Sequence, residues 1–348
     1  MSGICHLKMY EFKRLEPPYP WSQIESCRDH HVFKSQAWVE HLCSRLGLEI
    51  FIIEISQKGG IIGYFVGERF KCFYTVVGSP FDGWETPFQG CSFLIDITSK
   101  QRSVVYQELI PWILARKYCD YLQISDWDLN IEQVIHTKLR FQLQPGYYID
   151  LTQSRDEILG AMYKSTKGQI RKIFKPDFSA FTIEKVVDFN RFLKHHYSQL
   201  VDVFEKQGLT PTHSEQFLAN SILDMAAQDK VVAYEVYVGN KSAASCYRYY
   251  DGRMGFAIAA ASYREYQHLY LNEALYYTAL MDLKEKGIEV FECGGGRAYK
   301  EKYGPRPYVR PRIFAARHSY IITLRNLAKW GYYKIWKCTS LFRRKKCA

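Results

Sequence analysis

The chain has 348 residues, 47% of them hydrophobic, which is typical of a globular protein of two domains. Lys and Arg outnumber Asp and Glu by 47 to 36, giving a formal net charge of +11, so polyanions such as nucleic acid, anionic lipid or phosphorylated substrates are favoured partners. The ten cysteines include no Cys-x-x-Cys pair, and the sequence lacks a zinc finger, a basic zipper and an aromatic ribonucleoprotein signature. We therefore expect neither a zinc site nor sequence-specific nucleic-acid binding.

The first twenty residues are charged and include Pro17, Pro18 and Pro20. They lack the apolar core of a secretion signal. No uncharged apolar run approaches the ~20 residues that span a bilayer. We therefore expect a cytoplasmic protein with free thiols.

The first half of the chain alternates strands and helices. Its clearest helix begins after Ser35, a favourable N-cap, and ends at Gly47, with Trp38 and Leu42 on the apolar face. A hairpin of two buried strands follows, with its turn at residues 57–60. In chain order we predict strands over 7–12, 49–56, 60–65, 70–77, 121–125 and 146–151, and helices over 22–28, 35–46, 101–118 and 130–137.

A loop rich in proline and glycine spans residues 78–90. It carries Asp82 and Trp84, an acid and an aromatic ring of the kind that contacts substrates from loops. Rigid loops are also simple connectors. We keep Asp82 and Trp84 as candidate substrate-binding residues.

The second half begins with a capping box, in which Ser154 precedes Glu157 by three residues. A basic helix follows, with cations every three or four residues, so that Lys167 and Arg171 share one face. This face is either a solvated surface or a clamp for phosphate. Predicted helices over 164–175, 187–207 and 213–227 and a strand over 178–186 complete this part of the chain.

An antiparallel meander of three strands comes next. Its strands cover residues 231–238, 242–250 and 254–261. The third contains small side chains, among them Ala259 and Ala260, although alanine is a poor strand former. Small residues leave room for a ligand against this strand. A loop follows that carries Arg264, Gln267 and His268, and a helix is predicted over 271–286.

A glycine-rich segment spans residues 287–304. Gly287 ends the preceding helix, and a short β-prone run leads to three consecutive glycines, Gly294–Gly296. These glycines permit backbone shapes that a Cβ forbids and allow a ligand to come close. The segment also holds reactive or binding side chains, namely Arg297, Tyr299, Lys300, Lys302 and Tyr303. It is either the rim of an active site or a hairpin turn with solvated charges.

The two halves predict a similar order of elements, an internal repeat of architecture rather than of sequence. Four segments, over 33–38, 165–172, 267–275 and 291–304, resemble motifs of the Fem-type aminoacyltransferases and the FemAB-related acetyltransferases, tandem proteins of the GNAT superfamily. The resemblance implies an α/β (α+β) fold of two GNAT-like domains, each a mixed, mostly antiparallel sheet flanked by helices. We place these domains at 1–152 and 153–312, the second with the donor site, and a strand returning to the first domain plus a basic tail at 313–348.

The resemblance also implies transfer of an acyl group to an amine, a reaction whose oxyanion intermediate needs N–H donors or a cation. In GNAT folds a splayed strand offers those N–H groups, and the strand with Ala259 and Ala260 matches its place. Phosphates of CoA would lie at the N-terminus of the next helix, near Arg264, Gln267 and His268.

The remaining site residues come partly from this resemblance and partly from the side chains of the glycine-rich segment. Lys300 matches a lysine that stabilises the transition state, and Tyr299 and Glu292 are its candidate catalytic neighbours. Lys167 and Arg171 fall where the family contacts acceptor phosphate. Arg297 and Tyr303 complete the candidate substrate-binding set.

Three departures from the family bear on the donor. The usual GNAT pyrophosphate loop, Q/R-x-x-G-x-G/A, is absent. Trp38 is followed by Val39 and Glu40 rather than by the Fem-type lysine, and the long coiled-coil insertion of tRNA-binding members is missing. We therefore expect acyl-CoA as donor, without a metal, and as acceptor an amino group of a cell-envelope sugar, peptide or lipid precursor, phosphorylated or lipid-linked. The alternatives are an aminoacyl-tRNA-dependent Fem-type transferase and a non-catalytic scaffold that binds anionic partners.

The tail over 319–341 mixes aromatic and aliphatic side chains with Lys and Arg, and a basic cluster, Arg343–Lys346, follows. A basic, Trp-rich amphipathic helix suits the surface of an anionic membrane. The charges do not gather on one face, so packing on the enzyme is the alternative. We expect the tail to make peripheral contact with the inner face of the cytoplasmic membrane.

Overall fold

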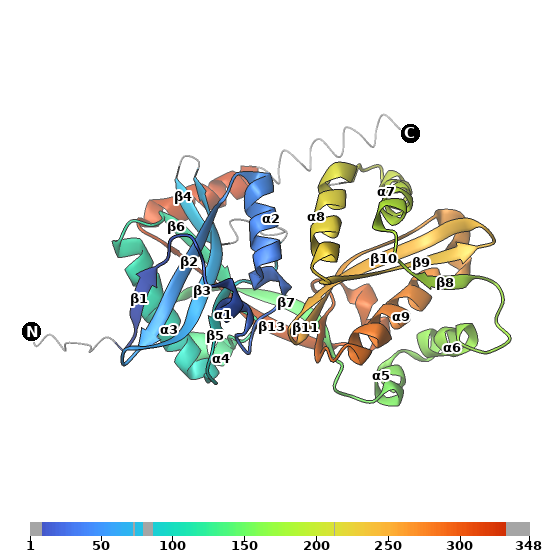
Figure 1. Ribbon diagram of the computed structural model, residues 1–348, viewed down its shortest axis with the longest axis horizontal. Coiled ribbons are helices and arrows are strands. Elements are labelled where there is room, and N and C mark those ends of the chain that lie inside the picture. Colours follow the sequence, from blue (N-terminus) through green and yellow to red (C-terminus); the bar gives the residue numbers. More distant parts are fainter. Residues whose placement is uncertain (1–8, 72–73, 79–85, 212, 332–348) are drawn as a thin grey trace, which may run out of the picture. The chain divides into compact units, whose positions relative to one another are not determined.

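The computed structural model describes residues 9–71, 74–78, 86–211 and 213–331 (Figure 1). These residues form two compact units. Unit 1 extends to Gln144 and resumes at Val309, and unit 2 runs from Pro145 to Tyr308. The chain leaves unit 1 within strand β7 (Arg140–Asp150) and returns within β13 (Arg306–Ala316).

Unit 1 is built on a mixed sheet. Its antiparallel strands are β1 (Glu11–Arg14), β2 (Glu49–Gln57), β3 (Gly60–Lys71) and β4 (Thr75–Gly78), and β5 (Gly90–Phe93) pairs with the first part of β3. β6 (Tyr121–Ser125) lies parallel to β4 and antiparallel to the end of β13. The helices are α1 (Trp21–Glu25), η1 (Val32–Lys34), α2 (Gln36–Leu46), α3 (Ser99–Ala115) and α4 (Ile131–Val134). The apolar core of this unit contains Val105, Leu109 and Ile113 of α3 together with Phe51 and Ile53 of β2.

Unit 2 has a sheet in the order β7-β12-β11-β10-β9-β8. Its strands are β8 (Thr182–Lys185), β9 (Val231–Val238), β10 (Lys241–Asp251), β11 (Met254–Ser262) and β12 (Val290–Glu292), with β7 beside β12. All pairs are antiparallel except β11 with β12. The helices are α5 (Arg155–Ala161), α6 (Lys164–Ile173), α7 (Phe189–Glu205), α8 (Glu215–Ala227) and α9 (Leu271–Glu285), with short turns η2 (Arg264–Leu269) and η3 (Ala298–Tyr303).

Strand β10 shows how the two faces of this sheet are used. Ala244 and Cys246 belong to the apolar core formed with α9, whereas Ser245 and Tyr247 contact His196 of α7. Alternate residues of a strand point to opposite faces, so α7 and α9 cover opposite sides of the sheet (Figure 1).

The two units share one order of elements. In each, three antiparallel strands (β2-β3-β4 and β9-β10-β11) lead to a helix (α3 and α9), and the next strand (β6 and β12) pairs in parallel with the third. Each of these parallel strands then pairs antiparallel with a strand from elsewhere in the chain, β13 in unit 1 and β7 in unit 2. The predicted class, two tandem units of mixed sheet flanked by helices, is confirmed.

Most predicted elements are present with shifted ends. The N-caps are confirmed, because Ser35 accepts a hydrogen bond from the Trp38 amide and Ser154 forms a capping box with Glu157. The single strand predicted over 70–77 is wrong, since β3 ends at Lys71 and β4 begins at Thr75. Strand β5 was not predicted, because its small and polar residues lack an alternating pattern. Asp82 and Trp84 lie outside the described residues.

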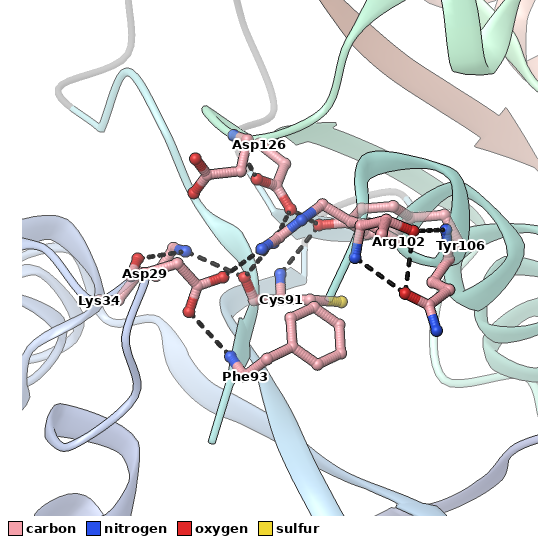
Figure 2. A network of polar contacts seen from close by, with 10 residues as sticks. Asp29, Lys34, Cys91, Phe93, Arg102, Tyr106 and Asp126 are labelled. Carbon is pink, nitrogen blue, oxygen red and sulfur yellow. Dashed lines mark hydrogen bonds and ion pairs between the residues drawn. The ribbon is translucent and has the colours of Figure 1, made fainter. Parts of the chain in front are cut away.

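Unit 1 contains a buried ionic network (Figure 2). The Arg102 guanidinium pairs with Asp29 and with Asp126, the latter at 2.8 Å. Tyr106 donates to Asp126 at 2.5 Å, and Lys34 Nζ donates to the Cys91 carbonyl at 2.9 Å. Burial disfavours the charge of Asp29, but Lys34 and Arg102 outweigh it and hold the pKa of this carboxyl below its ordinary value.

The chain after β13 continues as a helix over 319–331. Ile321 packs with Val76 and Tyr121 of unit 1, and Arg325 donates to Gln123 at 2.8 Å. Within the described part of the chain, no helix combines the length and apolarity required to cross a bilayer.

Candidate active site

A cavity of about 420 Å³ lies in unit 2. Strand β11 lines it with four consecutive residues, Ala257 to Ala260, and helix α9 contributes Asn272 and Tyr276. The remaining lining residues are Arg248, Cys293, Gly294, Arg297, Tyr299, Lys300, Lys302 and Tyr303. The small-residue strand and the glycine-rich segment, singled out separately in the sequence, therefore line one pocket.

The pocket forms where β11 and β12 part. The two strands pair only from Met254 to Phe256, because β12 ends at Glu292. Ile258 is an extra residue on β11, since Tyr247 and Arg248 of β10 pair with Ala259 and Ala257. Such a bulge bends a strand locally. Beyond Phe256, the edge of β11 that faced β12 has no neighbouring strand in the described structure.

Gly294 is required for this close approach. Its φ is +76°, and a Cβ there would lie 2.9 Å from the Ala257 carbonyl oxygen and 3.3 Å from Lys300 Nζ. Gly295 also has a positive φ, +83°, but a Cβ there would meet nothing within 4 Å. Gly294 therefore provides both the positive φ of the turn and the space that lets the turn approach Ala257 and Lys300.

The side chain of Glu292 stabilises the glycine turn through hydrogen bonds. Its carboxyl group accepts hydrogen bonds from the Gly294 amide at 2.7 Å, the Gly295 amide at 3.2 Å and the Tyr308 hydroxyl at 2.8 Å. Burial raises the pKa of Glu292. The carboxyl group does not line the pocket, so its contacts are those of a positioning residue.

Lys300 is 8% exposed and lies on η3. Its Nζ donates to the Gly294 carbonyl and, at 3.4 Å, to that of Gly295, and it lies 5.8 Å from the centroid of the Tyr299 ring. Burial lowers the pKa of Lys300, and the nearby cations Arg297 and Arg248 lower it further, against the opposing charge of Glu292. The ammonium group is thus desolvated and held at the pocket wall.

Two stacked phenols form another part of the wall. The rings of Tyr276 and Tyr303 lie 3.8 Å apart at 11°, and the Tyr276 hydroxyl is 3.4 Å from Cys293 Sγ. Burial raises the pKa of both phenols, so both are neutral near pH 7. Tyr299, by contrast, is 61% exposed.

Arg248 is a lining residue that the sequence did not identify. It lies on β10, is 3% exposed, and donates from Nη1 to the carbonyls of Tyr247 at 2.8 Å and Ala259 at 2.6 Å. The available signal was a single arginine within a strand whose residues 242–250 are otherwise apolar or small and polar.

The pocket is cationic. Four of its lining residues are Lys or Arg, whereas no Asp or Glu is among the described residues that line it. Among the described residues, Lys302 is the one of these four that forms an ion pair, with Glu273 at 2.6 Å. This lining favours an anionic or electron-rich ligand.

The other candidates lie elsewhere in unit 2. Arg264 pairs with Asp202 at 3.0 Å, and Gln267 accepts from Lys206 at 3.3 Å. These residues and His268 belong to η2, immediately before α9. Lys167, which donates to the Gly160 carbonyl at 3.3 Å, and the exposed Arg171 lie on α6. None of them lines the pocket with Lys300.

Comparison with known proteins bears on this pocket. Residues 162–303, which include every pocket residue, match the family model of the acetyltransferase (GNAT) domain. The structure of FemX is similar over 86% of this chain and 97% of its own, with 11% identity and a TM-score of 0.66. A conserved protein of unknown function from Bacteroides thetaiotaomicron VPI-5482 is similar over 85% and 94%, with 9% identity and a TM-score of 0.54. No curated protein matches. The GNAT fold expected from the sequence motifs is confirmed.

Proposed function

We propose that this chain, whose residues 162–303 form a domain of the GNAT acetyltransferase family, transfers an acyl group from acyl-CoA to an amine in the pocket beside β11. One observation carries the proposal. The part of β11 beyond Phe256, which β12 does not pair with, carries Ala257, Ala259 and Ala260 and lines the same pocket as a buried ammonium group, Lys300.

In the proposed reaction, the thioester lies along this edge, where a peptide-like chain can pair with the strand. The neutral amine nitrogen of the acceptor attacks the thioester carbonyl carbon and forms a tetrahedral oxyanion. Lys300 and backbone N–H groups of β11 stabilise that oxyanion. The C–S bond then breaks, the thiolate of CoA leaves, and the proton lost by the amine ends on the thiolate.

The N-terminus of α9 suits the phosphates of CoA. Its N-cap, Tyr270, has a φ of +59° and no capping side-chain hydrogen bond. Free amides at a helix N-terminus attract phosphate through hydrogen bonds and the helix dipole. Arg264, Gln267 and His268 precede this end and are the proposed phosphate contacts.

The acceptor contacts are proposed at the exposed side of the pocket and beyond it. Arg297 and Tyr299 are exposed lining residues. Lys167 and Arg171 on α6 remain the proposed partners for a phosphorylated, cell-envelope acceptor. Glu292 and Tyr303 act by positioning the glycine turn and Tyr276.

The donor is tested by mass spectrometry of the purified protein with a panel of acyl-CoAs and amine acceptors. Retention of one thioester and appearance of the acylated amine support the proposal. The net charge of +11 favours aminoacyl-tRNA as the second candidate donor, and activity abolished by ribonuclease would select it. Salt-sensitive anion binding without consumption of either donor would indicate a scaffold.

Lys300→Ala tests the catalytic assignment. Loss of one preorganised oxyanion donor lowers turnover by roughly 10²–10³-fold, so we expect a decrease of this size with the fold preserved by circular dichroism. Lys185→Ala, which breaks a half-exposed ion pair with Asp282, is the matched control. Unaltered turnover in Lys300→Ala would remove the role assigned to this lysine.

We also propose that the helix over 319–331 gives peripheral contact with an anionic membrane. Tyr320, Leu324, Leu327 and Trp330 are exposed on it, and the chain carries excess positive charge. Replacing Leu324, Leu327 and Trp330 by Ser should reduce sedimentation with vesicles that contain phosphatidylglycerol, because apolar burial and charge attraction add in such binding. Unchanged sedimentation after deletion of 319–348 would contradict the idea.

A further inference from the structure

Arg248 presents a buried guanidinium whose contacts with the described residues occupy one side. Its hydrogen bonds to these residues are donated by Nη1, to the backbone carbonyls of Tyr247 and Ala259 on the two sides of the bulge. Nε is buried and has no acceptor within the described residues. The edge formed by Nε and Nη2 therefore has no partner from the described chain.

The charge of Arg248 is not balanced by a neighbouring acid. No described carboxylate forms an ion pair with it, and none lines its pocket. The other cation buried in the pocket, Lys300, repels it, and burial together with Arg248 lowers the pKa of His196 to about 4, so this imidazole is neutral near pH 7. A buried charge without a partner costs several kcal/mol, and a ligand that supplies the counter-charge removes that cost.

The free edge also has a definite shape. Two parallel N–H groups on one side of a guanidinium match the two oxygens of a carboxylate, which they bind in a bidentate manner. This pair of parallel N–H groups forms a fork, which the ammonium group of a lysine cannot offer. The ring of Tyr276, 6.0 Å from the guanidinium carbon, adds an aromatic wall on the α9 side.

We infer that the substrate of this pocket carries a carboxylate, which binds the Nε–Nη2 edge of Arg248. The inference rests on the proposed function for the identity of the site. The carboxylate has two possible sources, namely the far end of the transferred acyl chain or the amine acceptor.

The experiment compares binding by calorimetry, which needs no turnover. The first arm compares succinyl-CoA with pentanoyl-CoA, a neutral thioester of similar size. The second arm compares an alanine dipeptide with its C-terminal amide in the presence of CoA. We expect the carboxylate to bind at least about tenfold more tightly than its neutral analogue in one arm, since charge-assisted hydrogen bonds are worth this much.

Variants then assign the effect to the guanidinium. Arg248→Lys keeps the charge but loses the fork, and Arg248→Met loses both, so each should abolish the preference for the carboxylate. Arg155→Met, which removes an exposed cation paired with Glu285, is the matched control and should keep it. Because Nη1 supports the bulge, thermal unfolding of each variant shows whether it folds, and the comparison of ligands on the unaltered chain does not depend on the variants.

The outcomes separate the two proposals. If no thioester binds, the proposed donor is wrong and the amine arm alone decides the inference. A preference in the first arm assigns the carboxylate to the acyl chain, and a preference in the second assigns it to the acceptor. Equal binding of charged and neutral members in both arms overturns the inference, as does a preference that persists in Arg248→Met.

Discussion

The surroundings of Lys300 act on its charge in opposite directions. Burial and the cations Arg297 and Arg248 favour its neutral form, and Glu292 favours its charged form. The net result is a pKa below the ordinary value of a lysine. Stabilisation of an oxyanion requires the ammonium form, so the lowered pKa limits the pH range of the proposed reaction.

The lowered pKa of Lys300 determines how turnover should depend on pH. As pH rises, Lys300 loses its proton before an exposed lysine would, so turnover should fall on the alkaline side at a pH below about 10.4, the ordinary lysine value. Lys300→Arg keeps its charge and should move this alkaline limb upward, whatever its effect on maximal turnover. The measurement is a pH–rate profile of both proteins with one acceptor. An alkaline limb at the same pH in both would assign it to another group.

The residues of the site were only partly predictable. One pocket is lined by six of the predicted residues, namely Lys300, Tyr299, Arg297, Tyr303, Ala259 and Ala260. They were predictable because the glycine motif and the run of small residues indicate a tight turn and an open strand. Arg248 was marked in the sequence only by its place in an otherwise uncharged strand, because its proposed role comes from burial without a counter-charge. Burial depends on packing against α9, which no local pattern contains.

At the scale of elements, the pocket depends on where β12 stops and the glycine turn begins. The end of the strand frees the edge of β11, and the turn returns the chain toward it at Gly294. Strand β7 pairs with β12 over only three residues, from Tyr148 to Asp150. The parting of the strands is therefore a property of a short segment of the sheet.

A pair of glycine variants tests this geometry. Gly294→Ala and Gly295→Ala carry similar strain from a positive φ, of the order of 1 kcal/mol, but only the first places a Cβ against Ala257 and Lys300. We expect Gly294→Ala to lower acyl transfer at least about tenfold further than Gly295→Ala, because Lys300 must move. Activity assays at equal folded fraction measure the difference, and equal losses would show that strain alone matters.

The elements themselves were predicted where local chemistry is decisive. Caps at Ser35 and Ser154 and the turns of the β9–β11 meander follow from side-chain and glycine preferences. Strand β5 was missed, since its residues are stabilised by β3 rather than by their own pattern. The short β12 was visible only as a β-prone run, because three residues give no periodicity.

At the scale of the whole molecule, one order of elements serves two purposes. In unit 2 the segment after the parallel strand β12 forms the pocket. In unit 1 the segment after the corresponding strand, β6, begins with Asp126, which pairs with Arg102 inside the ionic network of Figure 2. The residue directly after β6 therefore belongs to a buried ionic network, whereas the segment after β12 lines a pocket.

The ionic network predicts that replacing Arg102 strongly lowers the stability of the fold. Arg102→Met leaves Asp29 and Asp126 without this buried counter-charge, so we expect a loss of about 3–5 kcal/mol in the free energy of unfolding. Arg155→Met breaks an exposed pair with Glu285 and should cost less than about 1 kcal/mol. Urea unfolding followed by circular dichroism measures both, and a similar small loss in each would contradict the prediction.

Low pH should reduce the stability that the same ionic network contributes. The pKa of Asp29 is lower in the folded chain than its ordinary value of 3.8. Its contribution to stability is therefore present above that value and is lost as pH falls through the folded pKa. Arg102→Met removes one of the charges that lower this pKa, so the variant should be less sensitive to acid than the unaltered chain over this range.

The described residues that line the pocket include no carboxylate, and this bears on the choice of nucleophile. With no such group among them to take its proton, the amine best suited to attack the thioester is one that arrives uncharged. At pH 7.5 roughly a third of α-amino groups are in that form, against about one in a thousand lysine-type amines, given their ordinary pKa values near 7.8 and 10.4. The enzyme should therefore prefer weakly basic nitrogen, such as an α-amino group or the amine of a sugar, and leave lysine side chains unmodified.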